Sequence, residues 1–266
     1  MKHITFLTDF GLEDDFVGTC HGVMARIAPD ARVIDITHGI PPQAILQGAL
    51  VLRSTIKYMP VGIHLAVVDP GVGGHRRAVA VRTSDGRFFV GPDNGLLMLV
   101  ADELGVDAAH ELVDERYRLP EVSRTFHARD VFAPAAAHLA AGVPIEQLGP
   151  AIDPSDLVRV DVPAPSVGKS QISATVVGVD RFGNVSTNMR DDHVASLGVA
   201  RGDRVEVRLT FERYYATLAD TFADAAAGEL ILYEDSYGLV TLAISNGNAA
   251  RLTGVGVGDE LRIALA

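Results

Sequence analysis

One segment of the sequence has residue types that could carry out chemistry. It combines an acidic residue, a glycine-rich loop and two arginines. In VVDPGVGGHRRAV (67–79), Asp69 ends an apolar run, and Arg76 and Arg77 follow the glycines. A Walker-type phosphate loop needs Gly-Lys-Ser/Thr, and a dinucleotide-binding turn needs Gly-x-Gly-x-x-Gly leading into a helix. This segment has no lysine and leads into 78–81, which has the pattern of a strand. It therefore predicts neither kind of nucleotide loop, and a glycine-rich hairpin with a structural acid is the alternative interpretation.

A histidine lies in a second polar segment, RTFHARD (124–130), where His127 falls between an expected strand end and a helix start. An aspartate, an arginine and a histidine brought together can hold a water molecule, with the acid accepting its hydrogen bond and the cations favouring hydroxide. Taken alone, His127 is more often a hydrogen-bonded loop residue. The chain has no Gly-x-Ser-x-Gly elbow and no His-x-x-x-His pair, which disfavours serine acyl transfer and zinc hydrolysis.

The elements around these residues alternate between strand and helix signals. Apolar, β-branched runs predict strands at 4–9, 32–38, 63–69, 78–83 and 87–90. Helical spacing predicts helices at 15–28, at 43–58, after residue 95, and at about 129–141. This alternation is typical of an α/β fold in which a mostly parallel sheet carries helices on both faces.

Acidic and histidine side chains end three of the predicted strands. Asp9 ends the first strand, Asp35 and His38 end the second, and Asp69 ends the third. Ligands of open parallel sheets bind at the carboxyl ends of the strands, so these residues predict an acidic rim there. Each aspartate alone is more often a helix cap or turn residue, and the same alternative applies to Asp14 before the first helix.

The pattern changes after Gly149. The segment 161–170, DVPAPSVGKS, is rich in proline and small residues and is predicted to be a linker. Beyond it, strand-like runs at 172–180, 204–211, 229–235, 239–245 and 260–265 predict a small barrel or sandwich. We therefore expect an N-terminal α/β domain at 1–160, the linker, and a β domain at 171–266.

Three turns of the predicted β domain carry polar side chains. In VDRFGNVSTN (179–188), Asp180 follows a strand and Asn184 offers an amide that can read the edge of a base. The segments EDSYG (234–238) and SNGNAA (245–250) are further turns with amides and hydroxyls. Each of them is also simply a good turn sequence.

Composition excludes several classes of function. The chain has 266 residues and a net charge of −11, with no basic cluster to bind a nucleic-acid backbone. Its single cysteine, Cys20, excludes internal disulfides. The N-terminus lacks the apolar core of a signal peptide, and no apolar run approaches the length of a membrane span. We expect a cytoplasmic protein that does not contact the membrane.

Five motifs in order resemble one family. They are TDFG (8–11), DPGVG (69–73) with Arg76, TFHARD (125–130), FGN (182–184) and SNGNAA (245–250). The chain resembles, over essentially its whole length, the S-adenosylmethionine (SAM) hydroxide adenosyltransferases, or adenosine-forming SAM hydrolases, which are related to the fluorinase and chlorinase. The resemblance implies an α/β domain followed by a small β-barrel. It also implies a homotrimer whose ligand lies between domains of neighbouring subunits.

The resemblance also implies the site residues. Asp69, Arg76 and His127 are implied to activate water, with Arg76 preferred over Arg77 by its spacing from Asp69. Asp9 is implied to bind the ribose. Contacts to the methionine part fall on Asp14, Asp180, Ser236 and Tyr237, and contacts to adenine fall on Phe182, Asn184 and Asn246. The implied reaction converts SAM and water to adenosine and L-methionine with no metal and no cofactor, and the glycines are expected to bring the backbone close to the water and to C5′.

Departures from the halogenating relatives favour hydrolysis. The segment 81–95 has no room for the long insertion of the fluorinase, the chain has no tryptophan, and His127-Ala128 stands where the fluorinase has Tyr-Ser. These differences disfavour a chlorinase-like 5′-halo-adenosine synthase. A non-catalytic SAM or adenosine binder would not need the Asp–Arg–His set, and a nucleoside phosphorylase would need a phosphate site.

Overall fold

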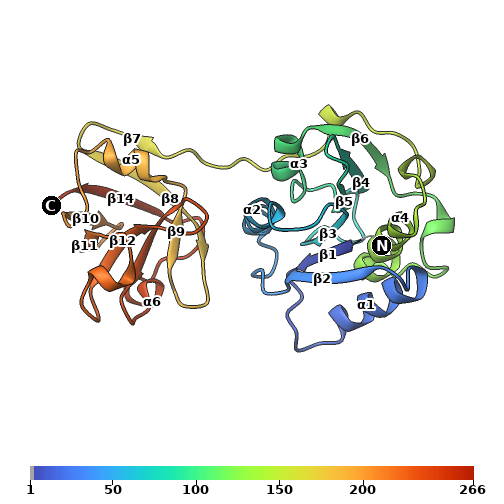
Figure 1. The fold of residues 1–266 in the computed structure, drawn as a ribbon, viewed down its shortest axis with the longest axis horizontal. Helices are drawn as coiled ribbons and strands as arrows, with labels where there is room; N and C mark the ends of the chain where they lie inside the picture. The colour runs from blue at the N-terminus through green and yellow to red at the C-terminus, as the bar shows by residue number, and fades with distance from the viewer. Residues whose placement is uncertain (1–2) are drawn as a thin grey trace. The chain divides into compact units, whose positions relative to one another are not determined.

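The computed structural model describes residues 3–266. The chain divides into two compact units, Met1–Val160 and Asp161–Ala266, each with its own core (Figure 1). No helix among the described residues is long and apolar enough to cross a membrane. The predicted fold class, a helix-flanked sheet followed by a β-barrel, is confirmed.

The first unit is built on a six-stranded sheet in the order β2-β1-β3-β5-β4-β6. Its strands are β1 (His3–Thr8), β2 (Arg32–Thr37), β3 (Ile63–Val67), β4 (Ala78–Thr83), β5 (Phe88–Pro92) and β6 (Val106–Glu111). Strands β2, β1, β3 and β5 run parallel, whereas β4 is antiparallel to both of its neighbours. All five residues of β3 are buried, as its continuous apolar run predicts for a central parallel strand.

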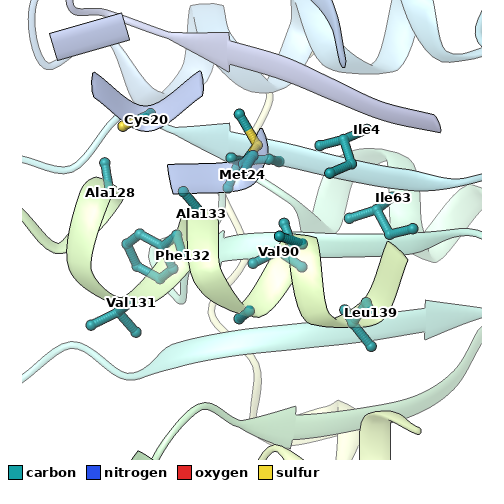
Figure 2. Close-up of a cluster of buried hydrophobic side chains, with 14 of the residues drawn as sticks. Ile4, Cys20, Met24, Ile63, Val90, Ala128, Val131, Phe132, Ala133 and Leu139 are labelled. Atoms are coloured by element: carbon teal, nitrogen blue, oxygen red, sulfur yellow. The ribbon is translucent and has the colours of Figure 1, made fainter. Parts of the chain in front are cut away.

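Helices cover both faces of this sheet (Figure 1). Helices α1 (Phe16–Ile27) and α4 (Ala133–Ala141) pack together, and α2 (Ile45–Ile56) packs with α3 (Met98–Leu104). Alternate strand residues point to opposite faces, so Ile63 and Leu65 enter the core beneath α1 and α4, whereas Ala66 enters the other core. Figure 2 shows the first core, with Met24 and Phe132 beside strand residues.

Two local predictions differ from the structure in this unit. The helix expected from about residue 129 begins instead as a π-helical turn, Ala128–Phe132, and becomes α-helical at Ala133. Strand β6 was not predicted, because its sequence VDAAHE lacks the β-branched run of the other strands and depends on pairing with β4. Short 3-10 turns at Glu115–Tyr117, Ile145–Gln147 and Pro154–Asp156 complete the unit.

The second unit is a closed barrel. Its strands are β8 (Gln171–Val179), β9 (Val185–Thr187), β10 (Arg204–Arg208), β11 (Arg213–Leu218), β12 (Leu230–Glu234), β13 (Val240–Ile244) and β14 (Glu260–Leu265). They pair in the order β14-β10-β11-β12-β13-β9-β8, and the further pairing of β8 with β14 closes the ring. Of the two predicted alternatives the barrel is the one that forms, and its closure removes the open edges that a sandwich would leave.

Short elements surround the barrel. Strand β7 (Ser166–Val167) pairs with β8 inside the segment predicted to be a linker. Helices α5 (Asp191–Ala195) and α6 (Ala249–Thr253) and a 3-10 turn at Phe222–Asp224 connect the strands. Helix α6 begins inside the motif SNGNAA, which was predicted to be only a turn.

Candidate active site

Asp69, Arg76 and His127 lie in direct contact. Arg76 Nε lies 3.0 Å from Asp69 Oδ1, and Arg76 Nη2 also donates to Oδ2, so the pair is bidentate. The same Nη2 lies 2.9 Å from His127 Nδ1. The Asp69 side chain is 6% exposed and that of Arg76 is 11% exposed. Two residues of the loop between β3 and β4 and one residue of a distant segment thus form one partly buried chain of hydrogen bonds.

Arg76 determines which ring nitrogen of His127 carries the proton. A guanidinium has donors only, so His127 Nδ1 must accept, and this assigns the proton to Nε2. Burial lowers the pKa of His127, and the charge of Arg76 lowers it further. Near pH 7 His127 is therefore neutral and presents an Nε2–H donor.

Arg76 also packs against an aromatic ring. Its guanidinium carbon lies 5.1 Å from the ring centroid of Phe132, which is fully buried in the core of the first unit. A cation over an aromatic face gains electrostatic attraction. This contact and the bidentate pair leave Arg76 little freedom, so the position of His127 Nδ1 is tied to the core.

Gly73 allows the glycine loop to reach the segment that carries His127. Its φ is +75°, and a Cβ atom there would lie 2.2 Å from the carbonyl oxygen of Arg124. No other residue type fits so close to a backbone atom. The sequence predicted that the glycines approach the substrate, whereas for Gly73 the structure shows a close approach between two loops of the protein.

We expect Gly73→Ala to lower both stability and activity. The clash must separate the loop from residue 124, and an ångström-scale displacement of reacting groups can reduce a rate by about 100-fold. Gly86→Ala is the matched control, because Gly86 has a φ of +83° but nothing within 4 Å of the added Cβ. Thermal unfolding and turnover should be measured for both. Equal losses in the two variants would show that backbone strain alone, and not the approach to residue 124, is responsible.

Arg77 has a different partner from Arg76. Its Nε lies 2.7 Å from Asp93 Oδ2, and its Nη2 donates to the carbonyl oxygen of Asp156. The buried Asp93 also accepts from the backbone N–H of Val158 at 2.8 Å. The two neighbouring arginines therefore separate, Arg76 toward Asp69 and Arg77 into a structural pair that the sequence did not reveal.

Asp130 organises the loop before His127. It is completely buried, and its carboxylate accepts from Arg129 Nε at 2.6 Å and from the backbone N–H of Ser123 at 2.8 Å. Its backbone carbonyl accepts from Leu119. Asp130 lies within the π-helical turn Ala128–Phe132, and such turns often mark functional sites. The motif HARD contained Asp130, but only His127 was singled out from sequence.

Asp9 lies at the same sheet edge as Asp69. Thr8 at the end of β1 pairs with Val67 at the end of β3, and each aspartate follows its strand. Asp9 Oδ2 accepts from the backbone N–H of Gln43 at 2.8 Å. Gln43 has a φ of +67°, an unusual conformation for a residue other than glycine. The Asp9 carboxylate thus stabilises a strained residue beside it.

The rest of the predicted rim is more dispersed. Asp35 does not end β2 but lies inside it, opposite Phe6. His38 contacts Thr8 through a 2.8 Å hydrogen bond. Asp14 is exposed, and Asp15, not Asp14, occupies the N-cap position of α1, without a side-chain bond to the helix backbone.

In the second unit, Asp180 and Asn184 bind each other. Asp180 Oδ1 accepts from the backbone N–H groups of Phe182 and Asn184, both at 2.9 Å, and Oδ2 accepts from Asn184 Nδ2 at 2.7 Å. These bonds hold Phe182 with 75% of its surface exposed. An exposed aromatic ring on a rigid turn is suited to stacking on a planar ligand.

The turns carrying Asn184 and Asn246 are brought together. A Cβ atom on Gly183 would lie 2.1 Å from the side chain of Asn248, and Ala250 N donates to the Gly183 carbonyl. Asn246 is exposed with a φ of +56°. Its neighbour Asn248 caps α6 by accepting from Arg251 N.

Ser236 and Tyr237 lie on the exposed turn between β12 and β13. Asp235 shapes this turn by accepting from the backbone N–H of Tyr237 at 2.8 Å. Its other oxygen accepts from Ser186 Oγ at 3.1 Å and so ties the turn to β9. Asp235 was not singled out from sequence; its place as the first residue of an Asp-Ser-Tyr-Gly turn is the signal that identifies it.

These features define a class: an α/β unit with a partly buried Asp–Arg–His set, followed by a β-barrel with ordered polar turns. The chain belongs to the SAM hydroxide adenosyltransferase family, whose N-terminal domain it matches over residues 4–149 and whose C-terminal domain it matches over 174–262. The resemblance seen in the motifs is therefore confirmed.

Three individual proteins illustrate the family relationship. An (R)-S-adenosyl-L-methionine hydrolase of Salinispora tropica is 47% identical over 98% of this chain and 97% of its own. The crystal structure of a conserved protein from Thermotoga maritima superposes with a TM-score of 0.90 at 38% identity, covering 98% of this chain and 99% of the other. A fluorinase of Actinopolyspora mzabensis is more distant, at 32% identity over 94% of this chain and 91% of its own.

Proposed function

We propose that this protein hydrolyses SAM to adenosine and L-methionine by attack of water on the ribose C5′. The contact of Asp69 with Arg76 and of Arg76 with His127 is the observation that carries the proposal. Membership of the family and high identity to (R)-S-adenosyl-L-methionine hydrolases support it. Following those names, we assign the (R) sulfonium epimer as the substrate.

The leaving group needs no acid catalyst. The water oxygen forms a bond to C5′, the C5′–S bond breaks, and its electron pair stays on sulfur, so the sulfonium departs as a neutral thioether. The remaining requirements are an in-line water, a fixed ribose and exclusion of bulk water. We therefore propose that the reaction uses neither a metal nor a cofactor.

The three residues have different roles toward the attacking water. His127 presents its Nε2–H because Nδ1 accepts from Arg76, so it donates to the water oxygen and does not act as the base. Asp69 keeps lone pairs that are not used by Arg76, accepts the proton of the water and passes it to solvent. Arg76 positions both partners and stabilises their charges.

The binding residues fall into three groups, according to the part of SAM that each would contact. Asp9 would accept from the ribose hydroxyls, and Phe182, Asn184 and Asn246 would contact adenine. Asp14, Ser236 and Tyr237 would contact the methionine part. Asp180 is already bonded within its own turn, so we assign its contribution mainly to positioning Phe182 and Asn184.

We further propose a homotrimer in which each site combines the first unit of one subunit with the second unit of the next. Mixing inactive variants tests this arrangement. If Asp69→Asn and Asn184→Ala chains are co-expressed, some sites in mixed assemblies contain neither substitution, and activity should recover. A double variant carrying both substitutions in one chain, co-expressed with each single variant, is the control. No recovery in mixed assemblies would place each site within a single chain.

Product analysis tests the reaction itself. Purified protein is incubated with each sulfonium epimer of SAM, with and without chloride, and the products are separated by chromatography and identified by mass spectrometry. We expect equal amounts of adenosine and L-methionine from the (R) epimer, independent of chloride. A 5′-chloro product would assign the protein to the halide-using enzymes, and SAM bound but returned intact would make it a binding protein.

The pH profile of the reaction should reflect the lowered pKa of His127. Because the neutral form is favoured, kcat/KM should stay level as the pH falls to the ordinary histidine value, about 6.5, and decline only below it. Protonation then places a proton on Nδ1, which breaks the bond from Arg76. His127→Gln should be slower and lack this acidic decline. A decline centred above 6.5, or one unchanged in His127→Gln, would contradict the assignment.

A further inference from the structure

Two histidines and an aspartate converge at the edge of the sheet in the first unit. His21 Nε2 on α1 lies 2.9 Å from Asp35 Oδ1 on β2, and His38 Nε2 lies 3.1 Å from the same oxygen. One potential ligand atom from each residue lies within 4.8 Å of the others. None of the three belongs to the set assigned to SAM hydrolysis.

His38 is the buried member of this cluster. Its side chain is only 3% exposed, yet its Nε2 makes no well-directed hydrogen bond, because the nearby Asp35 oxygen is close in distance but poorly aligned. A buried polar atom without a partner is uncommon and calls for an explanation. The unpaired atom points toward the place where the other two side chains meet.

The orientation of the His38 ring is supported by its neighbours. His38 Nδ1 is hydrogen-bonded to Thr8 Oγ1 at 2.8 Å, an arrangement that leaves Nε2 with a lone pair when Nδ1 carries the proton. The buried Phe6 packs against both imidazoles, with centroids 4.9 Å from His38 and 5.9 Å from His21. His38 therefore has the supporting hydrogen bond typical of a metal-ligating histidine, and His21 shares its packing on Phe6.

We propose that His21 Nε2, Asp35 Oδ1 and His38 Nε2 bind a divalent transition metal of the Zn²⁺ class. Imidazole nitrogens and one carboxylate oxygen suit Zn²⁺, which binds such atoms at about 2.0–2.2 Å and takes four ligands. Tetrahedral ligands at that distance are about 3.4 Å apart, so only small shifts of the present positions are needed.

The site is open on one side. The side chains of His21 and Asp35 are 35% and 42% exposed, which gives a metal access from solvent and leaves a water as its fourth ligand. Binding would link α1 to β2 and to His38. His38 is in turn hydrogen-bonded to Thr8, the residue that precedes Asp9. The sequence did not predict this site because positions 21, 35 and 38 match no zinc-binding spacing.

Direct metal titration tests the proposal. Untagged full-length protein is stripped with a chelator, and Zn²⁺ is titrated in competition with a chromogenic chelator. We expect one Zn²⁺ per chain, and Co²⁺ at the same site should give the visible absorption of tetrahedral N/O coordination. His21→Ala and Asp35→Asn, both at partly exposed side chains, should weaken binding by at least about tenfold.

His193→Ala is the matched control. Its Nδ1 lies 3.8 Å from Asp192 Oδ1, so it also forms a histidine–aspartate pair, and within residues 3–266 no second histidine joins them to form a metal-binding group. It should bind Zn²⁺ as the wild type does, and circular dichroism checks the fold of every variant. Fewer than one Zn²⁺ per chain, wild-type affinity in His21→Ala, or an equal loss in His193→Ala would each overturn the proposal and leave a hydrogen-bonded cluster.

Discussion

Replacing Asp69 with asparagine is expected to reduce adenosine formation by roughly 100- to 10,000-fold, the range for loss of a positioned general base. The amide keeps the size of the side chain but loses the negative charge that accepts the proton of the water. It also presents Arg76 with a neutral partner in place of a bidentate carboxylate. Single-turnover measurements of adenosine formation separate this loss of chemistry from weaker SAM binding.

The neighbouring arginine–aspartate pair offers a control for simple loss of stability. Asp93 is buried and bonded to Arg77, yet it has no assigned role in the reaction. Asp93→Asn should therefore lower the unfolding temperature while the rate per folded molecule stays close to that of the wild type. If Asp69→Asn retained the wild-type single-turnover rate, Asp69 would not be the base.

Replacing Arg129 with methionine should produce the largest loss of stability among the changes considered. The substitution leaves the buried Asp130 carboxylate without its ion-pair partner. Breaking a buried pair costs about 3–5 kcal/mol, and we expect about 3 kcal/mol here because Arg129 is itself one-third exposed. Urea unfolding monitored by circular dichroism at pH 7 measures the difference.

The pH dependence of this loss has a definite sign. Burial raises the pKa of Asp130, but hydrogen bonds from Arg129 and Ser123 outweigh it, so the pKa in the folded protein is lowered. The ion pair therefore stabilises the wild type above the ordinary aspartate pKa, about 3.9, and this contribution is lost as the pH falls through the lowered value. The difference between wild type and Arg129→Met should be complete at pH 7 and shrink in acid.

An exposed pair distinguishes this mechanism from a general effect of removing an arginine. Arg116 is bonded to Asp114 with a similar geometry, but its side chain is 70% exposed. Solvent-exposed pairs contribute little to stability, so Arg116→Met should unfold close to the wild type. A loss in Arg129→Met that did not shrink in acid would show that the missing packing on Phe126, and not the charge of Asp130, is responsible.

Local patterns predicted most of the elements and most of the residues singled out, but they missed strand β6 in the first unit and strands β9 and β11 in the barrel. The apolar run before Asp69 predicted a central strand because burial on both faces requires continuous apolar residues. Turns such as the one around Asn184 could be recognised from the sequence, because glycine and asparagine adopt backbone conformations that other residues avoid. The spacing of the motifs also identified the family.

Contacts between distant segments could not be predicted in this way. Sequence placed two arginines after the glycine loop, but only the fold directs Arg76 to Asp69 and Arg77 to Asp93. Asp130 looked like an ordinary polar residue until packing buried it beside Arg129.

The sequence by itself thus determined most of the alternation of strands and helices in the first unit, the polar turns and the candidate reacting residues, because hydrophobic periodicity and turn chemistry act over a few residues. Tertiary structure alone decided the partners of each charge, the close approach at Gly73 and the convergence of His21 with His38. Those outcomes depend on which loops the packed sheet brings together, and on the burial that makes a polar group require a partner.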